Sequence, residues 1–408
     1  MGQKLVSNSN LTRIVYLSTY PPRECGIANF TKDLIDAIGE LDGFSSSIIA
    51  VNEKSAIYDY DKRVKLKIDR DNIQDYIAAA EYVNASKSIK LVFIQHEFGL
   101  FGGNYGEYLN FFLEKVNKPV VTILHTVQPD FDQKAIEILR YIAKRSEAIV
   151  VIANAAVNML KKQDIPFKKC VVIPHGCPDV AYVDNKSVKA VLDLKNRLVA
   201  STFGLLSSGK GIEYVIKALP EVVKKDPRII YLIIGETHPE VRKHEGEKYR
   251  NNLMRLVTKL GLDEHVRFTN RFITKRELIR YLQATDIYLT PYISPNQISS
   301  GTLIYALGAG KAVVSTPYFH AQEVLANGRG ILCKFQDSAS IAAGMQMLLN
   351  EDFRNQIQKR AYIYSRRFLW KNVAEKYLNL INTVTKQNEC TQVENLSYKY
   401  GLCQSSNR

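Results

Sequence analysis

The sequence predicts an α/β protein built from two successive parallel-sheet domains that face a cleft. Short runs rich in Val and Ile alternate with helical patterns along most of the chain. These runs do not alternate apolar with polar residues, which is typical of strands covered on both faces of a parallel sheet. The alternation pauses over the polar stretch 178–196 and then starts again, which indicates a linker. Ligands of such sheets bind beyond the carboxyl ends of the strands, so functional residues are expected there.

The first half begins with a strand over 13–17, followed by a Pro21-Pro22 turn and a helix that starts near Gly26. The helix is predicted because its apolar residues share one face at helical spacing, at Ile27, Phe30, Leu34 and Ile38. The further strands of this half are predicted at 90–95, 120–125, 148–153 and 171–174.

A second cycle of strands and helices follows the linker. Its strands are predicted at 198–203, 229–235, 266–268, 287–290 and 312–316. Amphipathic helical patterns then extend from Ala339 to about residue 387. The remaining residues, 388–408, are polar and are predicted to form a loose tail.

The composition indicates a soluble globular protein. Of its 408 residues, 46% are hydrophobic and 24% charged. No apolar run approaches the roughly 18 residues that a transmembrane helix needs, and the polar N-terminus lacks the apolar core of a signal peptide. The six cysteines form no Cys-x-x-Cys pair, which disfavours a zinc site and a disulfide framework. A cytoplasmic location is therefore predicted.

The formal charge of +14 requires either anionic partners or a solvated basic surface. The lysines and arginines are dispersed along the chain and form no block typical of a nucleic-acid tail. A nucleic-acid partner is therefore disfavoured. Anionic small molecules and peripheral contact with the inner, anionic face of a membrane are the expected alternatives.

The segment from Gly204 to Gly211, with the sequence Gly-Leu-Leu-Ser-Ser-Gly-Lys-Gly, is the most informative motif. It follows a predicted strand and opens a predicted helix. Glycines let the backbone approach phosphate oxygens, a helix start offers N–H groups, and Lys210 adds a full charge. The spacing fits neither a Walker loop nor the three-glycine dinucleotide fingerprint. It therefore predicts an anion site of another kind.

Other polar residues also follow predicted strands. His125 ends one strand, and the pair His96-Glu97 ends another, where it could serve a second substrate or be structural. The sequence Asp59-Tyr60-Asp61 spells the Asp-x-Asp of metal-dependent transferases. It lies in a polar stretch with no strand before it, so no metal site is predicted.

The order of these motifs resembles that of the retaining group-4 glycosyltransferases, which have two Rossmann-like domains (the GT-B architecture, glycosyl transferases group 1). The resemblance covers about residues 14–374. It rests on six family features in this order: a Gly-rich loop, a strand-ending His, an Ile-Pro-Asn-Gly segment, a Gly-Arg-Leu…Lys-Gly loop, a two-glutamate segment before Ala-x-Gly-x-Pro-Val-Val, and a late Glu. In this sequence they are 23–28, His125, 173–176, 204–211, 297–314 and Glu323.

The chain departs from that family at three positions. Leu205 stands where the family has an arginine that partners the lysine, and Gln297 and Tyr305 stand where it has two glutamates. In the family the first glutamate binds sugar hydroxyls and the second binds the ribose diol; a tyrosine cannot accept both hydroxyls of a diol. The intervening Ser-Ser-Gly-Thr at 299–302 suits a diphosphate, with its small residues, hydroxyls and helix start. A divergent but active branch is therefore favoured over an inactive one.

The resemblance also implies an assignment of domains and residues. An acceptor domain is expected over 1–195, a nucleotide-sugar domain over 196–369, and a helix over 370–387 that crosses back to the first domain. Catalytic roles fall to His125 and Lys210, and acceptor binding is expected of His96 and Glu97. The residues expected to bind the donor are Gly26, Ile27, Ala28, Gly204, Ser208, Gly209, Gln297, Ser300, Gly301, Thr302 and Tyr305.

The function implied is metal-independent, retaining hexosyl transfer from a nucleoside-diphosphate sugar to a hydroxyl of a carbohydrate or lipid-linked acceptor, as in polysaccharide biosynthesis. No cofactor is expected; the preferred donor is GDP-mannose, with UDP-sugars next. Two alternatives stay open. One is an epimerase or phosphorylase on the same fold. The other is a catalytically silent sugar- or nucleotide-binding scaffold, which the missing glutamates would suit.

Overall fold

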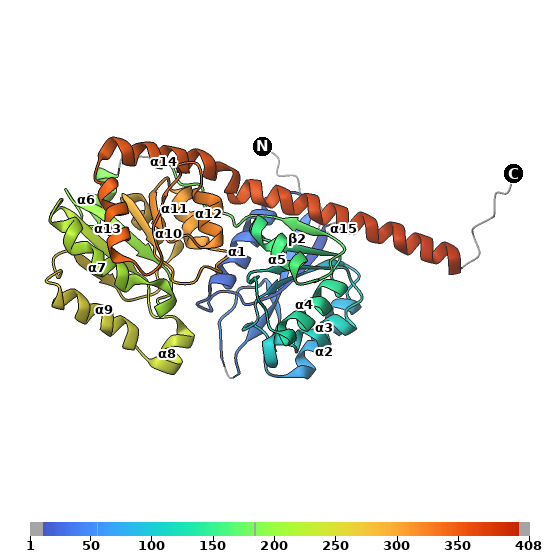
Figure 1. Cartoon of the computed structure of the whole chain (residues 1–408). Coiled ribbons are helices and arrows are strands. Elements are labelled where there is room, and N and C mark those ends of the chain that lie inside the picture. Colours follow the sequence, from blue (N-terminus) through green and yellow to red (C-terminus); the bar gives the residue numbers. More distant parts are fainter. Residues whose placement is uncertain (1–10, 55, 183–184, 400–408) are drawn as a thin grey trace. The chain divides into compact units, whose positions relative to one another are not determined.

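The computed structural model describes residues 11–54, 56–182 and 185–399, with side chains up to residue 386. Within these ranges the chain divides into two compact units. The first comprises residues up to 174 together with those from 371 onward, and the second comprises residues 175–370. Each unit contains one parallel β-sheet flanked by helices (Figure 1). The predicted fold class, α/β with two parallel-sheet domains, is confirmed.

The sheet of the first unit has seven strands among the described residues, in the order β3-β2-β1-β4-β5-β6-β7, and all neighbours are parallel. Its strands are β1 Thr12–Ser18, β2 Phe44–Asn52, β3 Val64–Asp69, β4 Ile89–His96, β5 Val120–Leu124, β6 Ala148–Val151 and β7 Cys170–Val172. The sequence did not predict β2 and β3. The first begins with a polar Ser triplet, and the second is an edge strand whose side chains alternate between exposed and half-buried before Ile68.

Along the chain, the helices α1 to α5 of the first unit each lie between two of its strands. They are α1 Gly26–Gly39, α2 Ile73–Ala85, α3 Leu109–Lys115, α4 Gln133–Arg145 and α5 Asn154–Lys162. Asn72 and Asp132 cap α2 and α4, and each accepts a hydrogen bond from an amide of the first turn. These helices bury apolar faces, which explains why the central strands are apolar on both sides.

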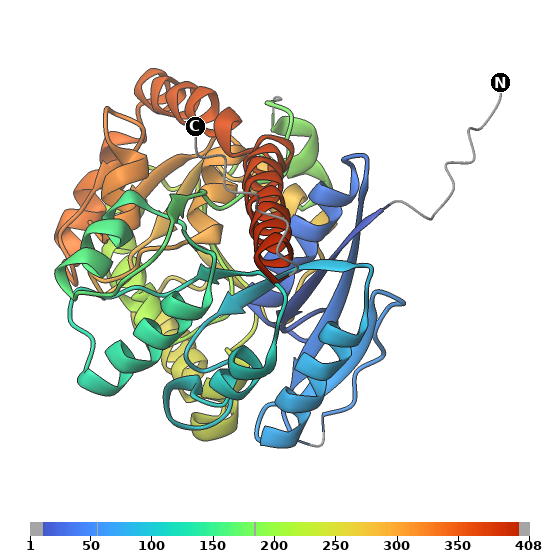
Figure 2. The same cartoon turned by 90° about the vertical axis from the view of Figure 1, so that its right-hand side faces the viewer.

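Helix α15, Trp370–Lys399, belongs to the first unit from Lys371 onward. Its buried residues recur at helical spacing and include Val373, Tyr377 and Ile381. The ring of Tyr377 packs edge-on against Phe93 of β4, with centroids 5.8 Å apart. Figures 1 and 2 both show the helix passing beside this unit. It extends beyond the expected end at 387, because neither Gly nor Pro interrupts the chain before Gly401.

The sheet of the second unit has six parallel strands among the described residues, in the order β10-β9-β8-β11-β12-β13. Its strands are β8 Leu198–Phe203, β9 Ile229–Ile234, β10 Val266–Thr269, β11 Ile287–Thr290, β12 Ala312–Ser315 and β13 Ile331–Leu332. Its helices are α6 Lys186–Val191, α7 Ile212–Val223, α8 Pro239–Glu245, α9 Lys248–Lys259, α10 Lys275–Ala284, α11 Gly301–Gly308, α12 Phe319–Leu325, α13 Ser338–Met347 and α14 Glu351–Ser365.

Two apolar cores lie on the two faces of this second sheet. Alternate residues of β8 enter different cores: Ala200 joins one with α7, α9 and α13, and Val199 joins the other with α11 and α12. The strand is therefore apolar throughout, which is the pattern that predicted a parallel sheet.

The segment 175–195, expected in the first domain, is assigned to the second unit. Cys177 exchanges backbone hydrogen bonds with Phe368 and Trp370, at 2.7 and 3.0 Å. Lys189 of α6 forms an ion pair with the buried Asp286, at 2.6 Å. These contacts attach the segment to residues far along the chain, and the sequence alone offers no signal of them.

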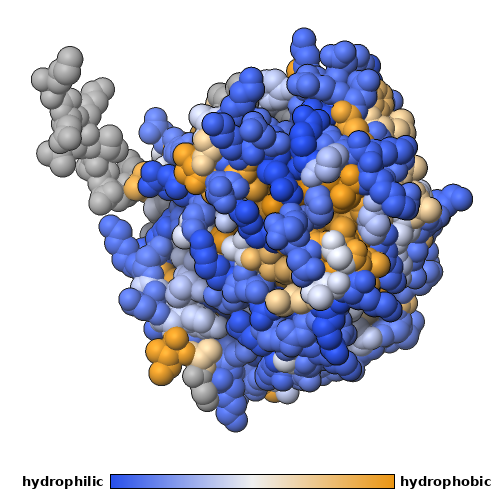
Figure 3. All heavy atoms as spheres, turned by 90° about the vertical axis from the view of Figure 1, so that its left-hand side faces the viewer, coloured by the Kyte–Doolittle hydropathy of each residue, from blue (hydrophilic) through white to orange (hydrophobic). Residues whose placement is uncertain are grey.

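The surface of the second unit that Figure 3 shows is mainly hydrophilic, with hydrophobic atoms visible between polar side chains. Among the helices of the described ranges, none combines the length and the apolar character needed to cross a membrane.

Candidate functional site

The loop between β8 and α7 contains the motif that the sequence singled out. Gly204 and Gly211 have φ values of +126° and +63°, which L-residues with side chains rarely adopt. Gly211 follows a 3-10 turn over Ser208–Lys210 and caps α7. A methyl group on Gly211 would overlap the carbonyl oxygen of Pro291. The loop therefore packs directly against the segment that follows β11, and glycine is required at this contact.

Lys210 is fixed by an aromatic residue of that second segment. Its Nζ lies 3.1 Å from the hydroxyl of Tyr292 and 4.3 Å from the centre of the same ring. The amide of Ile293 donates to the carbonyl oxygen of Gly209, at 3.1 Å. A hydrogen bond and a cation–π contact together hold the ammonium in one orientation. Ser208 and Gly209 are exposed beside it.

Helix α11 begins at the same place. Ser300 is its N-cap, and its hydroxyl accepts a hydrogen bond from the amide of Leu303, at 3.3 Å. The hydroxyl of Thr302 lies 2.9 Å from that of Tyr292 and 3.3 Å from that of Ser300. The first amides of a helix have no carbonyl partner within it, so those of Gly301 and Thr302 can face an anion.

His320 of α12 supports the start of α11. Its Nδ1 accepts a hydrogen bond from the amide of Ser300, at 2.9 Å. The imidazole is fully buried, and burial lowers its pKa to about 3, so the ring stays neutral and keeps this acceptor at physiological pH. Sequence reasoning missed both His320 and Tyr292, because these contacts join residues 10 to 82 positions apart.

The two positions where the family has glutamates differ from each other. Gln297 is exposed, and its side-chain amide donates to the carbonyl of Ser299. Tyr305 is half-buried, with its ring in edge contact with His175, centroids 6.0 Å apart, and near Phe203 at 6.4 Å. An aromatic group thus occupies the position of the second carboxylate.

Several of the expected site residues of the second unit therefore converge. Lys210 and Thr302 meet at Tyr292, and a methyl group on Gly204 would lie 3.5 Å from the Thr302 methyl carbon. These residues come from the carboxyl ends of β8 and β11 and from the start of α11. One full positive charge, two hydroxyls and a helix N-terminus make an arrangement suited to a diphosphate.

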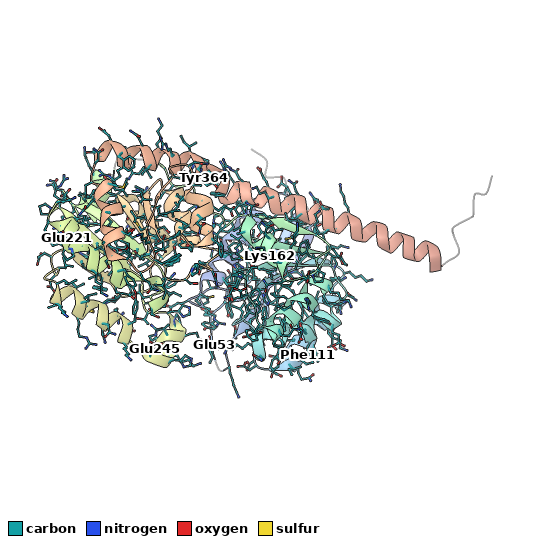
Figure 4. All side chains as sticks on the ribbon, in the orientation of Figure 1. Glu53, Phe111, Lys162, Glu221, Glu245 and Tyr364 are labelled. Carbon is teal, nitrogen blue, oxygen red and sulfur yellow. The ribbon has the colours of Figure 1, made fainter. Side chains whose placement is uncertain are left out.

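In the first unit, Gly26, Ile27 and Ala28 form the first turn of α1, whose amides can likewise face an anion. The preceding loop is tied to the end of β2 by an ion pair between Arg23 and Glu53, at 2.6 Å (Glu53 is labelled in Figure 4). Apart from its chain neighbours and its own helix backbone, no atom of the described residues lies within 4 Å of a Cβ built on Gly26, so their packing does not require glycine there.

His125 follows β5 and is oriented by its neighbours. Its Nε2 lies 2.7 Å from Oε1 of Gln95, and its ring meets Phe30 edge-on, centroids 4.9 Å apart. Gln95 lies on the neighbouring strand β4, and its side-chain nitrogen, Nε2, donates no hydrogen bond to a described residue. His125 is half-buried at the carboxyl end of the sheet, where a substrate is expected.

His96 and Glu97 differ in exposure. The ring of His96 is fully enclosed beside Phe98 and Phe101, and burial lowers its pKa to about 4. Glu97 is half-buried and accepts hydrogen bonds from the Thr126 hydroxyl, at 2.6 Å, and the amide of Phe98, at 3.1 Å. Burial outweighs these bonds and raises the pKa of Glu97. Of the pair, Glu97 is the one that can reach a ligand.

The second carboxylate of the Asp-x-Asp sequence forms an ion pair with an arginine of the same chain. Asp61 pairs with Arg63, at 2.9 Å, and accepts a hydrogen bond from Tyr20, at 3.4 Å. Within the described ranges, no three His, Cys, Asp or Glu side chains are grouped so that they could hold a metal ion.

Comparison with known sequences agrees with this picture. Residues 184–364 match the model of the family described as glycosyl transferases group 1. An uncharacterized glycosyltransferase of Methanocaldococcus jannaschii is 27% identical over 248 residues, 58% of this chain and 59% of that protein. A phosphatidyl-myo-inositol mannosyltransferase of Mycolicibacterium smegmatis is 27% identical over 181 residues, 43% of this chain and 42% of that protein. The chain thus spans about half the length of these curated relatives.

Comparison with solved structures covers nearly the whole fold. A glycosyltransferase of Rickettsia africae has a TM-score of 0.74 at 18% identity, covering 92% of this chain and 99% of that one. Anabaena HepE, solved with UDP and glucose, has a TM-score of 0.73 at 16% identity, covering 91% and 100%. At this identity the likeness shows the fold, which is that of GT-B glycosyltransferases. The sequence match to the glycosyl transferases group 1 model, over residues 184–364, lies within the second unit and agrees with this fold.

Proposed function

We propose that this protein is a metal-independent, retaining glycosyltransferase that moves a hexose from a nucleoside-diphosphate sugar to a hydroxyl of a carbohydrate or lipid-linked acceptor. The observation that supports it best is the convergence of Lys210, Thr302 and the first turn of α11 around the Tyr292 hydroxyl. Negative charge develops on the departing diphosphate, and fixed donors aimed at that charge are usually the largest contribution to catalysis.

In the proposed reaction, Lys210 and the amides of Gly301 and Thr302 stabilise the leaving diphosphate. Gly26, Ile27 and Ala28, in the first turn of α1, are proposed to bind donor phosphate oxygens through their amides. The bond from the anomeric carbon to the diphosphate breaks and a bond to the acceptor oxygen forms on the same face of the sugar, and the departing phosphate takes the acceptor proton, as the resemblance implies. This scheme assigns no protein nucleophile and no cofactor.

The donor is proposed to be GDP-mannose first and a UDP-sugar second. The Mycolicibacterium smegmatis relative is a mannosyltransferase by name, whereas Anabaena HepE was solved with UDP and glucose. Tyr305, beside Phe203, offers one hydroxyl and an aromatic face. Ribose recognition is therefore proposed to be weaker than a carboxylate would provide, with most of the affinity in the diphosphate.

The acceptor is proposed to bind at the carboxyl ends of β4 and β5. His125, held by Gln95, is proposed to contact sugar hydroxyls, and Glu97 to hold an acceptor hydroxyl. His96 is fully buried beside Phe98 and Phe101 and precedes Glu97 directly, so it is proposed to position Glu97 rather than to bind the acceptor itself. A carboxyl with a raised pKa can accept or donate a hydrogen bond near neutral pH.

Peripheral contact with an anionic membrane is part of the proposal. Basic side chains gather at the ends of α4 and α5 and just before β7: Lys144, Arg145, Lys161, Lys162, Lys168 and Lys169 (Lys162 is labelled in Figure 4). An apolar groove of about 630 Å³, lined by Tyr141, Pro166 and Phe167 among others, lies beside them. Each Lys or Arg near an anionic surface contributes about 1 kcal/mol. In a sedimentation assay, we expect the protein to pellet with anionic phosphatidylglycerol vesicles but not with neutral phosphatidylcholine vesicles. The double variant Lys161→Glu/Lys162→Glu is expected to stay in the supernatant with both.

The silent scaffold is the second candidate, because carboxylates are missing at Gln297 and Tyr305. A donor-turnover assay separates the two: the protein is incubated with GDP-mannose and UDP-glucose in EDTA, with and without glycan acceptors. Release of nucleoside diphosphate, unchanged by EDTA, supports the enzyme. Binding without turnover supports the scaffold, and strict dependence on added metal would contradict the proposed mechanism.

A further inference from the structure

One aromatic residue of the second unit connects the two parts of the candidate diphosphate site, the loop before α7 and the start of α11. Tyr292 lies in the segment after β11 and is 5% exposed. Its ring stacks on that of Tyr318, with centroids 5.1 Å apart and planes 19° apart. Its hydroxyl lies 3.1 Å from Lys210 Nζ and 2.9 Å from the Thr302 hydroxyl. A buried phenol thus ends between a cation and a helix N-terminus.

The segment around Tyr292 is rigidly joined to both partners. Thr316 donates its side-chain hydrogen bond to the Tyr292 carbonyl oxygen, at 2.6 Å. On one side the adjacent Ile293 amide bonds to Gly209. On the other, Thr302 belongs to the first turn of α11, which Ser300 and His320 fix. The phenol position is therefore set by the fold, and the flexible lysine adapts to it.

We propose that Tyr292 is a positioning residue for the donor diphosphate: its hydroxyl holds the Lys210 ammonium and the Thr302 hydroxyl at one point, and it must keep its proton for the diphosphate to bind. This inference rests on the proposed function, because it assumes that the site takes a diphosphate. Tyr292 acts here through Lys210 and Thr302 and need not touch the donor.

The proton requirement follows from charge. A neutral phenol accepts a hydrogen bond from Lys210 and leaves the full positive charge for phosphate oxygens. A phenolate at 3.1 Å would neutralise Lys210 and place a negative charge beside the diphosphate. Protonated Tyr292 is thus the form that binds, and binding at alkaline pH draws a proton onto it.

The groups around Tyr292 favour ionisation of its hydroxyl. Although burial opposes ionisation, the charge of Lys210 and hydrogen bonds from Thr302, Ser300 and Lys210 lower the pKa of Tyr292 below its ordinary value of 10. The other titratable groups that face it are Tyr288 of β11 and Tyr318, and burial raises the pKa of both. Of these three phenols, Tyr292 ionises first as pH rises.

The first measurement uses the unmodified protein with UDP and GDP as probes. Calorimetry at pH 7 and at stepped alkaline pH, in two buffers of different ionisation enthalpy, reports affinity and proton uptake together. We expect affinity to fall as pH rises through the lowered pKa of Tyr292, by up to about tenfold per pH unit, with uptake of a proton on binding. Nucleotide binding without proton uptake over that range overturns the inference.

The second measurement uses Tyr292→Phe, which keeps the ring beneath Lys210 and removes only the hydroxyl. At pH 7 we expect about three- to tenfold weaker binding, the net effect of one hydrogen bond, and loss of the alkaline proton uptake. Both proteins keep Lys210 and bind the same nucleotides, so the comparison isolates the Tyr292 hydroxyl. Tyr231→Phe is the matched control: it removes another buried phenol, bonded to Thr202 at 2.7 Å, on the other face of the sheet.

The outcomes separate the two proposals. If the unmodified protein binds neither nucleotide, the proposed function fails and the inference fails with it. If it binds, and Tyr292→Phe keeps both the affinity and the proton uptake, only the inference fails. If Tyr292→Phe does not fold, the proton uptake of the unmodified protein decides. A purely structural role would weaken binding in Tyr292→Phe and leave no proton uptake in the unmodified protein, and that result also overturns the inference.

Discussion

One buried carboxylate of the second unit connects three separate parts of the chain. Asp286 follows α10 and bonds to Lys189, at 2.6 Å, to the Asn185 side chain, at 2.7 Å, and to the amide of Val199, at 2.7 Å. A buried carboxylate is tolerated when its oxygens are satisfied in this way. This one residue joins α6 to β8.

A second lysine near Asp286 makes stability depend on pH. Lys311 is 8% exposed, and burial lowers its pKa from 10.5 to about 8, although Asp286 opposes the shift. Between pH 8 and 10.5 the unfolded chain therefore binds more protons at this site than the folded chain, and folding gains stability as pH rises. Relative to Lys311→Met, the wild-type free energy of unfolding is expected to rise by on the order of 3 kcal/mol across this range.

Urea unfolding of the two proteins at stepped pH values measures this difference. Lys217→Met, a change on α7 away from Asp286, is the comparison for general effects of alkaline pH. A difference between wild type and Lys311→Met that stays constant from pH 8 to 10.5 would show that Lys311 is charged in the fold throughout.

At the scale of the element, the loop between β8 and α7 depends on one glycine. Gly211→Ala places a methyl group on the Pro291 carbonyl oxygen, at a φ of +63°. We expect this change to displace Lys210 and to weaken UDP or GDP binding at least tenfold, with loss of stability of a few kcal/mol. Gly261→Ala is the control, because Gly261 has a similar φ of +64°, no described atom lies within 4 Å of its Cβ, and it follows α9, outside the candidate site. Equal affinities of the two variants would mean that the loop adapts.

Helix α15 makes a separate prediction for the first unit. Tyr377 is fully buried against Phe93, so Tyr377→Ala removes a large side chain from a packed site. The expected loss of unfolding free energy is about 3–5 kcal/mol. Lys376→Ala, one residue earlier and exposed, should change it by less than about 0.5 kcal/mol. Thermal unfolding distinguishes them, and similar melting temperatures would show that α15 does not stabilise this unit.

The elements that the sequence predicted are those whose signal is local. The central strands are apolar on both faces, and the Gly-Lys-Gly motif can be recognised from three adjacent residues. Strand β2 was missed because Ser residues open it, and β3 because an edge strand needs little apolar surface. Tyr292 and His320 were missed for a different reason: a phenol and an imidazole acquire roles only when folding brings Lys210 and Ser300 to them.

At the scale of the whole molecule, each unit repeats one principle. Parallel strands collect loops at one edge, and the most polar loops of each unit lie there: those before α1 and after β4 and β5 in the first, and those after β8 and β11 in the second. The expected boundary near residue 195 was drawn from polar composition. The structure assigns 175–195 by long-range bonds to Phe368 and Asp286, which composition does not encode.

The central claim is that the second unit binds the diphosphate of a nucleotide-sugar through Lys210. Isothermal calorimetry of UDP and GDP with wild type, Lys210→Ala and Lys225→Ala, in EDTA, tests it most directly. Lys225 is an exposed lysine bonded to Gln346, at 2.7 Å, on the far end of α7. A charge-assisted contact to phosphate is worth about 1.5–3 kcal/mol, so Lys210→Ala should bind roughly 10- to 150-fold more weakly while Lys225→Ala matches wild type. Wild-type affinity in a folded Lys210→Ala protein would contradict the account.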